Sequence, residues 1–481
     1  MKNGFIWTAV SLISLLNVLE PSTEPLKERL DAIFNGHSYA VWSIQVEDKE
    51  TGKSLYSMTP HRRLIPASNE KLIVCAAAML RLGPNYTYNT EFYTTGKIQN
   101  SMLQGDLIVA GAGDPSLGGR FYDGDATFLM RQWAEKFKQK GIQTIQGDVI
   151  GVDDVFDDDP HGLNWHPSDL IEWYAAEVSA LSFNDGCVDI QVLGAPVSGQ
   201  PANISWNPPT RYVDVQSDVQ TVRSAKNERG VIVQREPEST EIQLTGSIRA
   251  KGAATVYVTI PNPTLYFATV FKEILQAEGI QVRGSARDGD DIQLPDQKTW
   301  EKAFDHPSMP LIQLLDVCMK NSQNLYAEHF LKTLGFAEYG IGSWQTGAMA
   351  IKDVFFKHGC AIDALYLADG SGLSRENRIS ADALVQILRI MDQSSYAGTF
   401  FDAMPKAGVN GTLKHRMRGT DAYGRVFAKT GTLNGIRALS GKIEAKSGKT
   451  YLFSILGNAT RQASLITGMM DEACALIAGE G

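Results

Sequence analysis

Apolar and polar residues recur with two different periods near the start of the chain. Apolar residues have helical spacing over 26–34, which predicts an amphipathic helix. Over 40–46 every second residue is apolar and its neighbours are mostly polar, which is typical of a strand with one better-buried face. After a turn, residues 54–56 can return as a partner strand. The pattern therefore predicts a helix followed by a β-hairpin.

The next segment, 71–80, is almost wholly apolar apart from its first residue, Lys71. Pro66 disfavours helix before it and Ser68 is a good capping residue, so a buried helix should begin at or beside Ser68. Residues three apart in its first turn share a face, so the Ser68 hydroxyl and the Lys71 amine point the same way. Burial lowers the pKa of a lysine, and a neutral amine can take the proton of a neighbouring hydroxyl. This arrangement describes an activated serine nucleophile.

The Ser-x-x-Lys spacing alone more often means a capping serine and a solvated lysine. Ser68 is, however, the only serine of this chain that is followed three residues later by lysine. The interpretation then depends on what lies downstream.

Two downstream pieces supply groups that such a nucleophile needs. Ser322 and Asn324 lie on a short connection between two predicted buried helices, where they can line a cleft, although residues of this kind also cap helices. Lys429-Thr430-Gly431 ends a predicted strand, with a positive charge for a carboxylate, a hydroxyl, and a glycine that lets a ligand approach closely. These features fit a site that binds a peptide C-terminus by strand addition.

Ser-x-x-Lys, Ser-x-Asn and Lys-Thr-Gly in this order resemble the signature of the penicillin-recognising serine acyltransferases. The long separation between Ser68 and Ser322, with the shorter one between Ser322 and Lys429, resembles the class C low-molecular-mass penicillin-binding proteins. These are the D-alanyl-D-alanine carboxypeptidase/endopeptidases of peptidase family S13. Three further stretches are similar to that family: 105–115, 322–328 and 369–375.

The resemblance implies an α/β (α+β) fold with a serine β-lactamase/transpeptidase-like domain, in which a five-stranded antiparallel sheet lies between helices. Short β-like runs between turn residues predict two inserted β-rich domains over 86–290. Residues 23–85 and 291–481 should then form the two parts of the transpeptidase-like domain.

The resemblance also implies a role for each motif residue. Ser68 attacks the carbonyl of the penultimate D-alanine. Lys71, kept neutral by burial and by nearby positive charge, is its base, and Ser322 relays the proton to the departing D-alanine. The backbone N–H groups of Ser68 and Thr432 should form the oxyanion hole. The expected substrate-binding residues are Asn324, Lys429, Thr430, Gly431 and Thr432, with Asp153 (or Asp154), Leu373 and Arg375 around the diamino acid of the stem peptide.

The N-terminus carries an export signal. Residues 1–3 form a short positive region and 5–19 an apolar run, so that 1–22 are expected to be a signal peptide or an uncleaved anchor. We therefore expect an exported protein of the periplasm or cell envelope. No second run approaches membrane length, so the body should be peripheral to the membrane at most.

Composition excludes several other classes. The net charge is −9 without a basic block, which argues against nucleic acid as a partner. The five cysteines are scattered and the eight histidines lack metal-site spacing, so neither a disulfide framework nor a metal is expected. The acidic run 153–159 lacks the spacing of a calcium loop, and no cofactor is expected.

The expected partners are peptidoglycan stem peptides as substrates and β-lactam antibiotics as covalent inhibitors. Two alternatives stay open: a penicillin-binding or cell-wall sensor that acylates without turnover, and a β-lactamase. The second is disfavoured because no Glu-x-x-x-Asn loop, which could supply a deacylating base, lies between Ser322 and Lys429.

Overall fold

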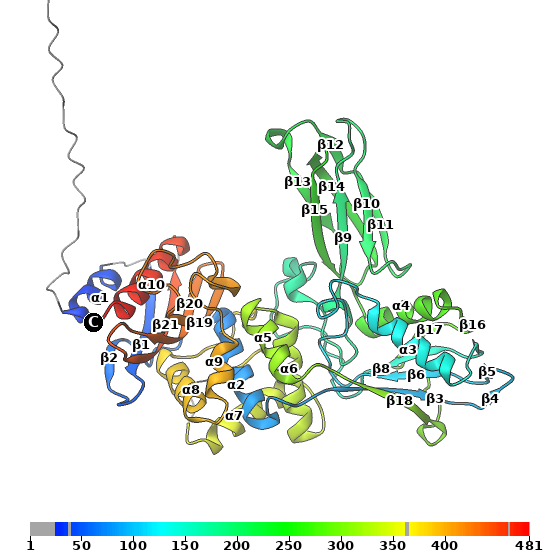
Figure 1. Ribbon diagram of the computed structural model, residues 1–481, viewed down its shortest axis with the longest axis horizontal. Helices are drawn as coiled ribbons and strands as arrows, with labels where there is room; N and C mark the ends of the chain where they lie inside the picture. The colour runs from blue at the N-terminus through cyan, green and yellow to red at the C-terminus, as the bar shows by residue number, and fades with distance from the viewer. Residues whose placement is uncertain (1–24, 37–39, 361–364, 460–461, 481) are drawn as a thin grey trace, which may run out of the picture.

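The computed structural model describes residues 25–36, 40–360, 365–459 and 462–480. The expected signal peptide or anchor, 1–22, lies outside the described residues. Within the part of the chain that is described, no helix combines the length and the apolar character needed to cross a membrane. Figure 1 shows the first and last helices, Leu26–Phe34 and Ala463–Ala478, in one domain, while residues 89–307 form two projecting parts.

A five-stranded antiparallel sheet joins the two ends of the chain. In spatial order its strands are β19 (Val426–Leu433), β20 (Ile436–Glu444), β21 (Thr450–Ala459), β1 (Ala40–Asp48) and β2 (Ser54–Met58). The N-terminal β1 pairs with the C-terminal β21 along its whole length. This sheet confirms the predicted fold class.

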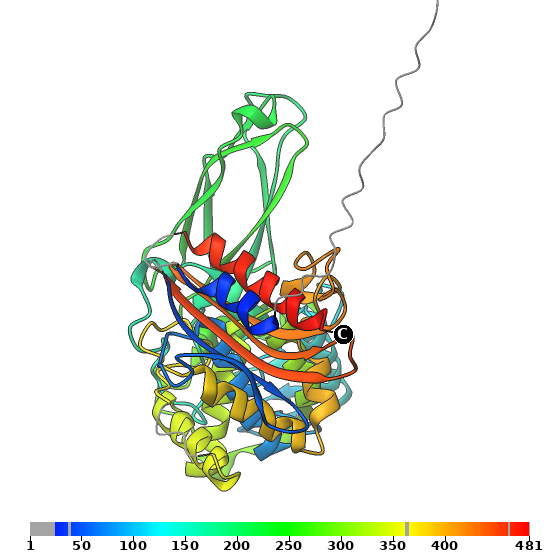
Figure 2. The same ribbon diagram turned by 90° about the vertical axis from the view of Figure 1, so that its left-hand side faces the viewer.

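Alternating side chains of this sheet face two different helical layers. Phe453 and Ile455 pack on one face with α1 (Leu26–Phe34) and α10 (Ala463–Ala478), which lie across the sheet in Figure 2. Leu452 and Leu456 face the other side, where they join the core built around α2 (Glu70–Leu82).

Helix α2 is surrounded on all sides. Every residue from Glu70 to Met79 is buried, because a helix that is apolar all round must be covered all round. The helices of this layer are α5 (Leu311–Lys320), α6 (Asn324–Tyr339), α7 (Trp344–Lys357), α8 (Ala381–Gln393) and α9 (Ala397–Asp402). The predicted buried helix is therefore confirmed.

The first projecting part contains two sheets and two helices. One sheet consists of β17 (Ala286–Asp288), β8 (Val149–Val152), β6 (Leu107–Ala110), β3 (Asn89–Thr94) and β18 (Glu301–Pro307). The other consists of β16 (Gln281–Val282), β7 (Thr144–Ile145), β5 (Met102–Leu103) and β4 (Ile98–Gln99). Several of these pairs are parallel and require crossover connections, which contain α3 (Phe128–Gln139) and α4 (Pro263–Ala277). Helix α3 was not anticipated from the sequence.

The second projecting part is made of two small sheets (Figure 1). The first contains β10 (Asn203–Asn207), β9 (Cys187–Leu193) and β15 (Ala253–Thr259). The second contains β11 (Asp214–Ser217), β14 (Glu241–Arg249), β12 (Gln220–Val222) and β13 (Gly230–Gln234).

Strand β18 bears on the proposed division into domains. It falls within 291–481, expected to belong to the transpeptidase-like domain, yet it pairs with β3 of the first projecting part. We therefore propose that the inserted region extends to Pro307, where the chain turns toward α5.

Candidate active site

Ser68 lies on a 3₁₀ turn, η1 (Ala67–Asn69), that leads directly into α2. The serine is partly exposed, while Lys71 one turn later is wholly buried. A close contact holds the turn in place, because a Cβ added at Gly372 would lie only 1.9 Å from the Ala67 carbonyl oxygen. The loop 369–375 therefore packs directly against the nucleophile turn.

Lys71 Nζ makes three polar contacts. It donates to Asn324 Oδ1 at 2.7 Å and to the Ser371 carbonyl oxygen at 2.6 Å, and lies 3.1 Å from Ser68 Oγ. A neutral amine has two N–H donors and one lone pair, and the amide and carbonyl oxygens can only accept. In the neutral form of Lys71, the lone pair is therefore left for the Ser68 hydroxyl.

Burial is the main cause that lowers the pKa of Lys71 below its ordinary value of 10.5. Nearby positive charge, also expected to act on this lysine, is not among the main influences. Instead Glu328, Asp369 and two buried thiols raise its pKa and oppose burial in part. Desolvation alone thus favours the neutral base.

Asn324 is held from two sides. It begins α6, and its Nδ2 donates to the Tyr174 carbonyl oxygen at 2.6 Å while its Oδ1 accepts from Lys71. Tyr174 belongs to η3 (Trp173–Ala175) in the inserted region. The asparagine therefore orients the base and links it to the insert.

Lys429 approaches from β19. Its Nζ donates to Ser322 Oγ at 2.8 Å and to the Thr430 carbonyl oxygen at 2.9 Å. Burial, with the charge of Lys71, holds the pKa of Lys429 well below its ordinary value, which differs from the fixed positive charge expected from the sequence. A carboxylate beside Nζ would raise this pKa again, because an opposite charge favours the ammonium form.

The structure gives a different reason for a glycine at the third position of the Lys-Thr-Gly motif than the expected approach of a ligand. A Cβ added at Gly431 would lie 2.6 Å from the Pro66 carbonyl oxygen, so here the glycine lets β19 approach the nucleophile turn. Asn69 Nδ2 reinforces this approach by donating to the Lys429 carbonyl oxygen at 2.9 Å. Thr430 Oγ1 donates to Thr412 Oγ1 at 2.8 Å, and Thr432 is exposed.

The structure thus brings together the turn at Ser68, the connection at Ser322 and Asn324, and the strand at Lys429. We refer to these residues with Lys71 as the serine–lysine network. Its members come from three widely separated parts of the chain.

Beneath the network lie buried acids that the sequence analysis missed. Glu328 accepts hydrogen bonds from the backbone N–H groups of Gly370 and Ser371 and from Trp344 Nε1. Burial raises its pKa to about 7. Because Ser371 in turn accepts from Lys71, Glu328 fixes the loop that positions the base. The sequence did contain a signal for this residue: a carboxylate four residues after Asn324, on a helix predicted to be buried.

Asp369 joins residues of the same loop to one another and to the inserted region. Its two oxygens accept from four donors: Trp165 Nε1, Gly372 N, Ser374 N and Asn377 Nδ2.

Glu70 completes this group. It is wholly buried, and among the described residues neither of its carboxyl oxygens has a hydrogen-bond partner. Burial, followed by the charges of Asp369 and Glu328, raises its pKa well above the ordinary value, which favours the neutral acid.

Leu373 and Arg375 lie near the far end of β19. Leu373 is buried in a cluster with Phe156 and Leu325, against which Leu433 packs. Arg375 Nη2 donates to the Asn434 carbonyl oxygen, just beyond β19, at 2.8 Å.

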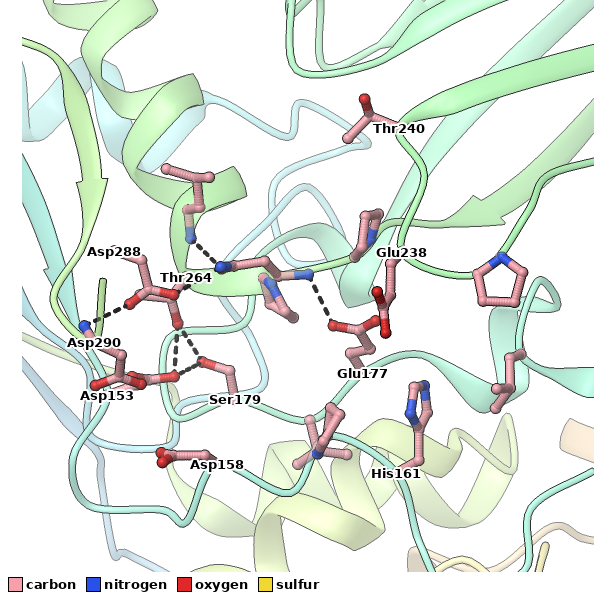
Figure 3. Close-up of a pocket in the computed structure, with 18 of the residues that line it drawn as sticks. Asp153, Asp158, His161, Glu177, Ser179, Glu238, Thr240, Thr264, Asp288 and Asp290 are labelled. Atoms are coloured by element: carbon pink, nitrogen blue, oxygen red, sulfur yellow. Dashed lines mark hydrogen bonds between the residues drawn. The ribbon is translucent and has the colours of Figure 1, made fainter. Parts of the chain in front are cut away.

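Asp153 lies elsewhere. Its Oδ2 accepts from Ser179 Oγ at 2.6 Å and from Thr264 Oγ1 at 2.7 Å (Figure 3). It lines a cavity of about 630 Å³ whose walls all come from the inserted region. Asp154 is exposed on a different hollow beside Tyr93. The structure therefore does not join either aspartate to the serine–lysine network.

A five-stranded antiparallel sheet between helical layers, with a serine at a helix start beside a buried amine, defines the serine β-lactamase/transpeptidase-like class. Comparison with known proteins places the chain within it. Residues 26–475 match the D-Ala-D-Ala carboxypeptidase 3 (S13) family, and the chain belongs to that family.

Two relatives illustrate the similarity in sequence. The D-alanyl-D-alanine carboxypeptidase of Actinomadura sp. (strain R39) is 33% identical over 448 residues, which are 90% of this chain and 81% of that protein. The D-alanyl-D-alanine carboxypeptidase DacB of Haemophilus influenzae is 28% identical over 401 residues, 81% of this chain and 79% of the relative.

The fold is also similar to solved structures. The crystal structure of penicillin binding protein 4 from Haemophilus influenzae has a TM-score of 0.78 at 23% identity, covering 92% of this chain and 97% of that one. A complex of the same protein with a β-lactam has a TM-score of 0.73 at 22% identity.

Proposed function

We propose that this protein is a serine D-Ala-D-Ala carboxypeptidase that acts on peptidoglycan stem peptides through an acyl-enzyme at Ser68. The observation that carries the proposal is the position of the buried Lys71 amine, which lies 3.1 Å from Ser68 Oγ and contacts Asn324 Oδ1 and the Ser371 carbonyl oxygen. The family and the carboxypeptidase relatives support the same activity.

Acylation begins when Lys71 takes the hydroxyl proton and Ser68 Oγ attacks the carbonyl carbon of the penultimate D-alanine. The backbone N–H groups of Ser68 and Thr432 are proposed to stabilise the oxyanion, where each such donor contributes about 3–4 kcal/mol. Asn324 holds the substrate amide and orients Lys71.

Release of the terminal D-alanine requires a proton on its nitrogen. Ser322 is placed for this relay because its hydroxyl accepts from Lys429 and can pass its own proton onward. Lys429 and Thr430 bind the terminal carboxylate, whose arrival restores the charge of Lys429. Water then hydrolyses the ester and regenerates Ser68.

β-Lactams carry the same acyl group in a strained ring and are proposed to acylate Ser68 with slow release. Leu373 and Arg375 are proposed to line the subsite for the stem peptide, near the Leu433 end of β19. The exported location in the periplasm or cell envelope is part of the proposal. It is supported by the N-terminal apolar run and by relatives named for cleavage of D-alanyl-D-alanine.

The test compares the protein with its Ser68→Ala variant. We expect the wild type to gain the mass of one benzylpenicillin and to release D-alanine from a pentapeptide. Ser68→Ala should lose both by at least about 10³-fold while its circular dichroism is unchanged. Ser57→Ala, at an exposed serine of β2, is the matched control and should behave as wild type.

Three results would contradict the proposal. Labelling that survives in Ser68→Ala would mean that the nucleophile is wrong. Labelling of the wild type without D-alanine release would favour a sensor. Rapid turnover of nitrocefin would favour a β-lactamase.

A further inference from the structure

A cavity of about 600 Å³ lies beside the connection that carries Ser322. Asn321 and Gln323, the neighbours of Ser322 in the chain, form part of its wall. The other lining residues belong to the inserted region, and they include Arg120, Trp173 and Tyr257. The volume is that of a site for a sizeable ligand and is larger than a single D-alanine requires.

The wall of this cavity is tied to the serine–lysine network. Asn324 donates to the carbonyl oxygen of Tyr174, the residue after Trp173. On the other side of Trp173, Glu172 forms a β-bridge with Val258, which brings the segment of Trp173 beside that of Tyr257. Both aromatic side chains are accessible, with exposed fractions of 37% for Trp173 and 52% for Tyr257.

Positions along β19 distinguish the acyl side of the proposed site from its leaving-group side. Arg375 and Leu433 mark one end, where the acyl part of the substrate is proposed to lie. Lys429 lies in the middle of the strand, and its Nζ contacts Ser322, the proposed proton donor to the departing nitrogen. The cavity adjoins Ser322 through Asn321 and Gln323, so it lies on the side of the leaving group.

The lining carries charges of both signs. Arg120 and Asp185 form a half-buried ion pair, and Asp189 lies in the same wall. Burial, reinforced by Asp185, raises the pKa of Asp189 to about 6, and a cation beside it would lower this pKa again. Aromatic faces with both a cation and carboxylates suit a peptide that bears amino and carboxylate groups.

We propose that this cavity binds the leaving stem peptide of a cross-linked peptidoglycan substrate, with Arg120, Trp173 and Tyr257 as its main contacts. This inference rests on the proposed function. Ser68 Oγ forms the ester with the D-alanyl carbonyl as the C–N bond of the cross-link breaks. The freed nitrogen takes its proton through Ser322 and leaves as the amine of the second peptide. Water then hydrolyses the ester to the carboxylic acid.

The experiment measures kcat/KM for two defined muropeptides, a cross-linked dimer and a pentapeptide monomer, with products identified by mass. In Tyr257→Ala and Arg120→Met, we expect the ratio of dimer to monomer cleavage to fall about tenfold, as loss of one charged or aromatic contact predicts. Tyr366→Ala is the matched control, because Tyr366 is 47% exposed and does not line the cavity. Its ratio should stay at the wild-type value.

The outcomes separate this inference from the proposed function. A ratio that stays within twofold of wild type in both variants, or a wild type that cleaves the monomer but never the dimer, would overturn the cavity assignment and leave the carboxypeptidase intact. Equal loss of both activities in folded variants would also overturn it. A wild type that cleaves neither substrate would refute the proposed function itself.

Discussion

Two groups of carboxylates in this protein show how differently the same residue type is used. Beneath the serine–lysine network, Glu328 and Asp369 together accept seven hydrogen bonds, from Gly370, Ser371, Trp344, Trp165, Gly372, Ser374 and Asn377. In the inserted cavity of Figure 3, Asp153, Asp288 and Asp290 offer oxygens that all lie within 4.8 Å of one another. Burial and the neighbouring carboxylates raise the pKa of Asp290 to about 6.

The comparison teaches that the number of donors and the degree of burial, together with the neighbouring charges, determine what an acid does. Glu328 and Asp369 stabilise the loop 369–375, because each hydrogen bond that they accept from a backbone N–H fixes one residue of the loop against Lys71. The acids of the insert repel one another, so they weaken the fold wherever all of them are ionised.

The largest effect is expected from replacing Lys71, the base that Glu328 and Asp369 help to position. Lys71→Met should lower the rate of β-lactam acylation at least about 10³-fold, because it removes the proton acceptor and keeps the volume. Lys332→Met is the matched control, since Lys332 is another buried lysine, paired with Asp157 at 2.6 Å. It should lose stability but retain acylation. A Lys71→Met protein that acylates normally would refute the assigned base.

Replacing Glu328 should have the next largest effect. Glu328→Ala leaves three buried donors without an acceptor, so we expect the free energy of unfolding to fall by about 3 kcal/mol. Urea unfolding followed by fluorescence measures it. Glu328→Gln, which keeps an acceptor oxygen, should lose about half as much. An unchanged midpoint in Glu328→Ala would show that the hydrogen bonds do not support the loop.

The pH dependence of acylation tests the neutral state of Lys71. Because its pKa is lowered in the folded protein, the acylation rate should rise about tenfold per pH unit as Lys71 loses its proton and then level off below pH 10.5. Stopped-flow mixing with a chromogenic β-lactam gives the profile. A rate that continues to rise to pH 10.5 would show an unshifted lysine.

The smallest effect is expected in the inserted cavity. The pKa of Asp290 is raised to about 6 in the folded state, so its favourable contribution is complete below its ordinary pKa of 3.8 and is lost as pH rises through 6. Asp290→Asn should therefore raise the melting temperature by about 1–2 °C at pH 8, a small gain because the side chain is exposed.

Two controls sharpen this prediction. At pH 4 the Asp290→Asn difference should vanish, because the wild-type carboxyl is then protonated. Asp305→Asn removes the charge of another exposed aspartate, on β18, and should shift the melting temperature less at pH 8. A lower melting temperature for Asp290→Asn at pH 8 would mean that these carboxylates do not repel one another.

Much of the transpeptidase-like domain could be predicted from local sequence. Helix α2 and the strands β1 and β2 lie close to their expected bounds, because the period of apolar residues depends only on near neighbours. The three motifs likewise named the residues that meet at the site. Helix α3 was missed. The pairing of β18 with β3 was not anticipated either, because strand pairing is not visible in either segment alone.

What the sequence by itself determined was therefore the type of several elements of the transpeptidase-like domain, and the choice of Ser68, Lys71, Ser322, Asn324 and Lys429 as candidate site residues. The tertiary structure decided how these groups are supported. It alone places Glu328 and Asp369 under the base, turns Gly431 toward Pro66, and keeps Asp153 among the residues of the insert. The physical reason is that hydrogen bonds and close backbone contacts join residues hundreds of positions apart, whereas the periodic pattern records only whether each residue faces a core.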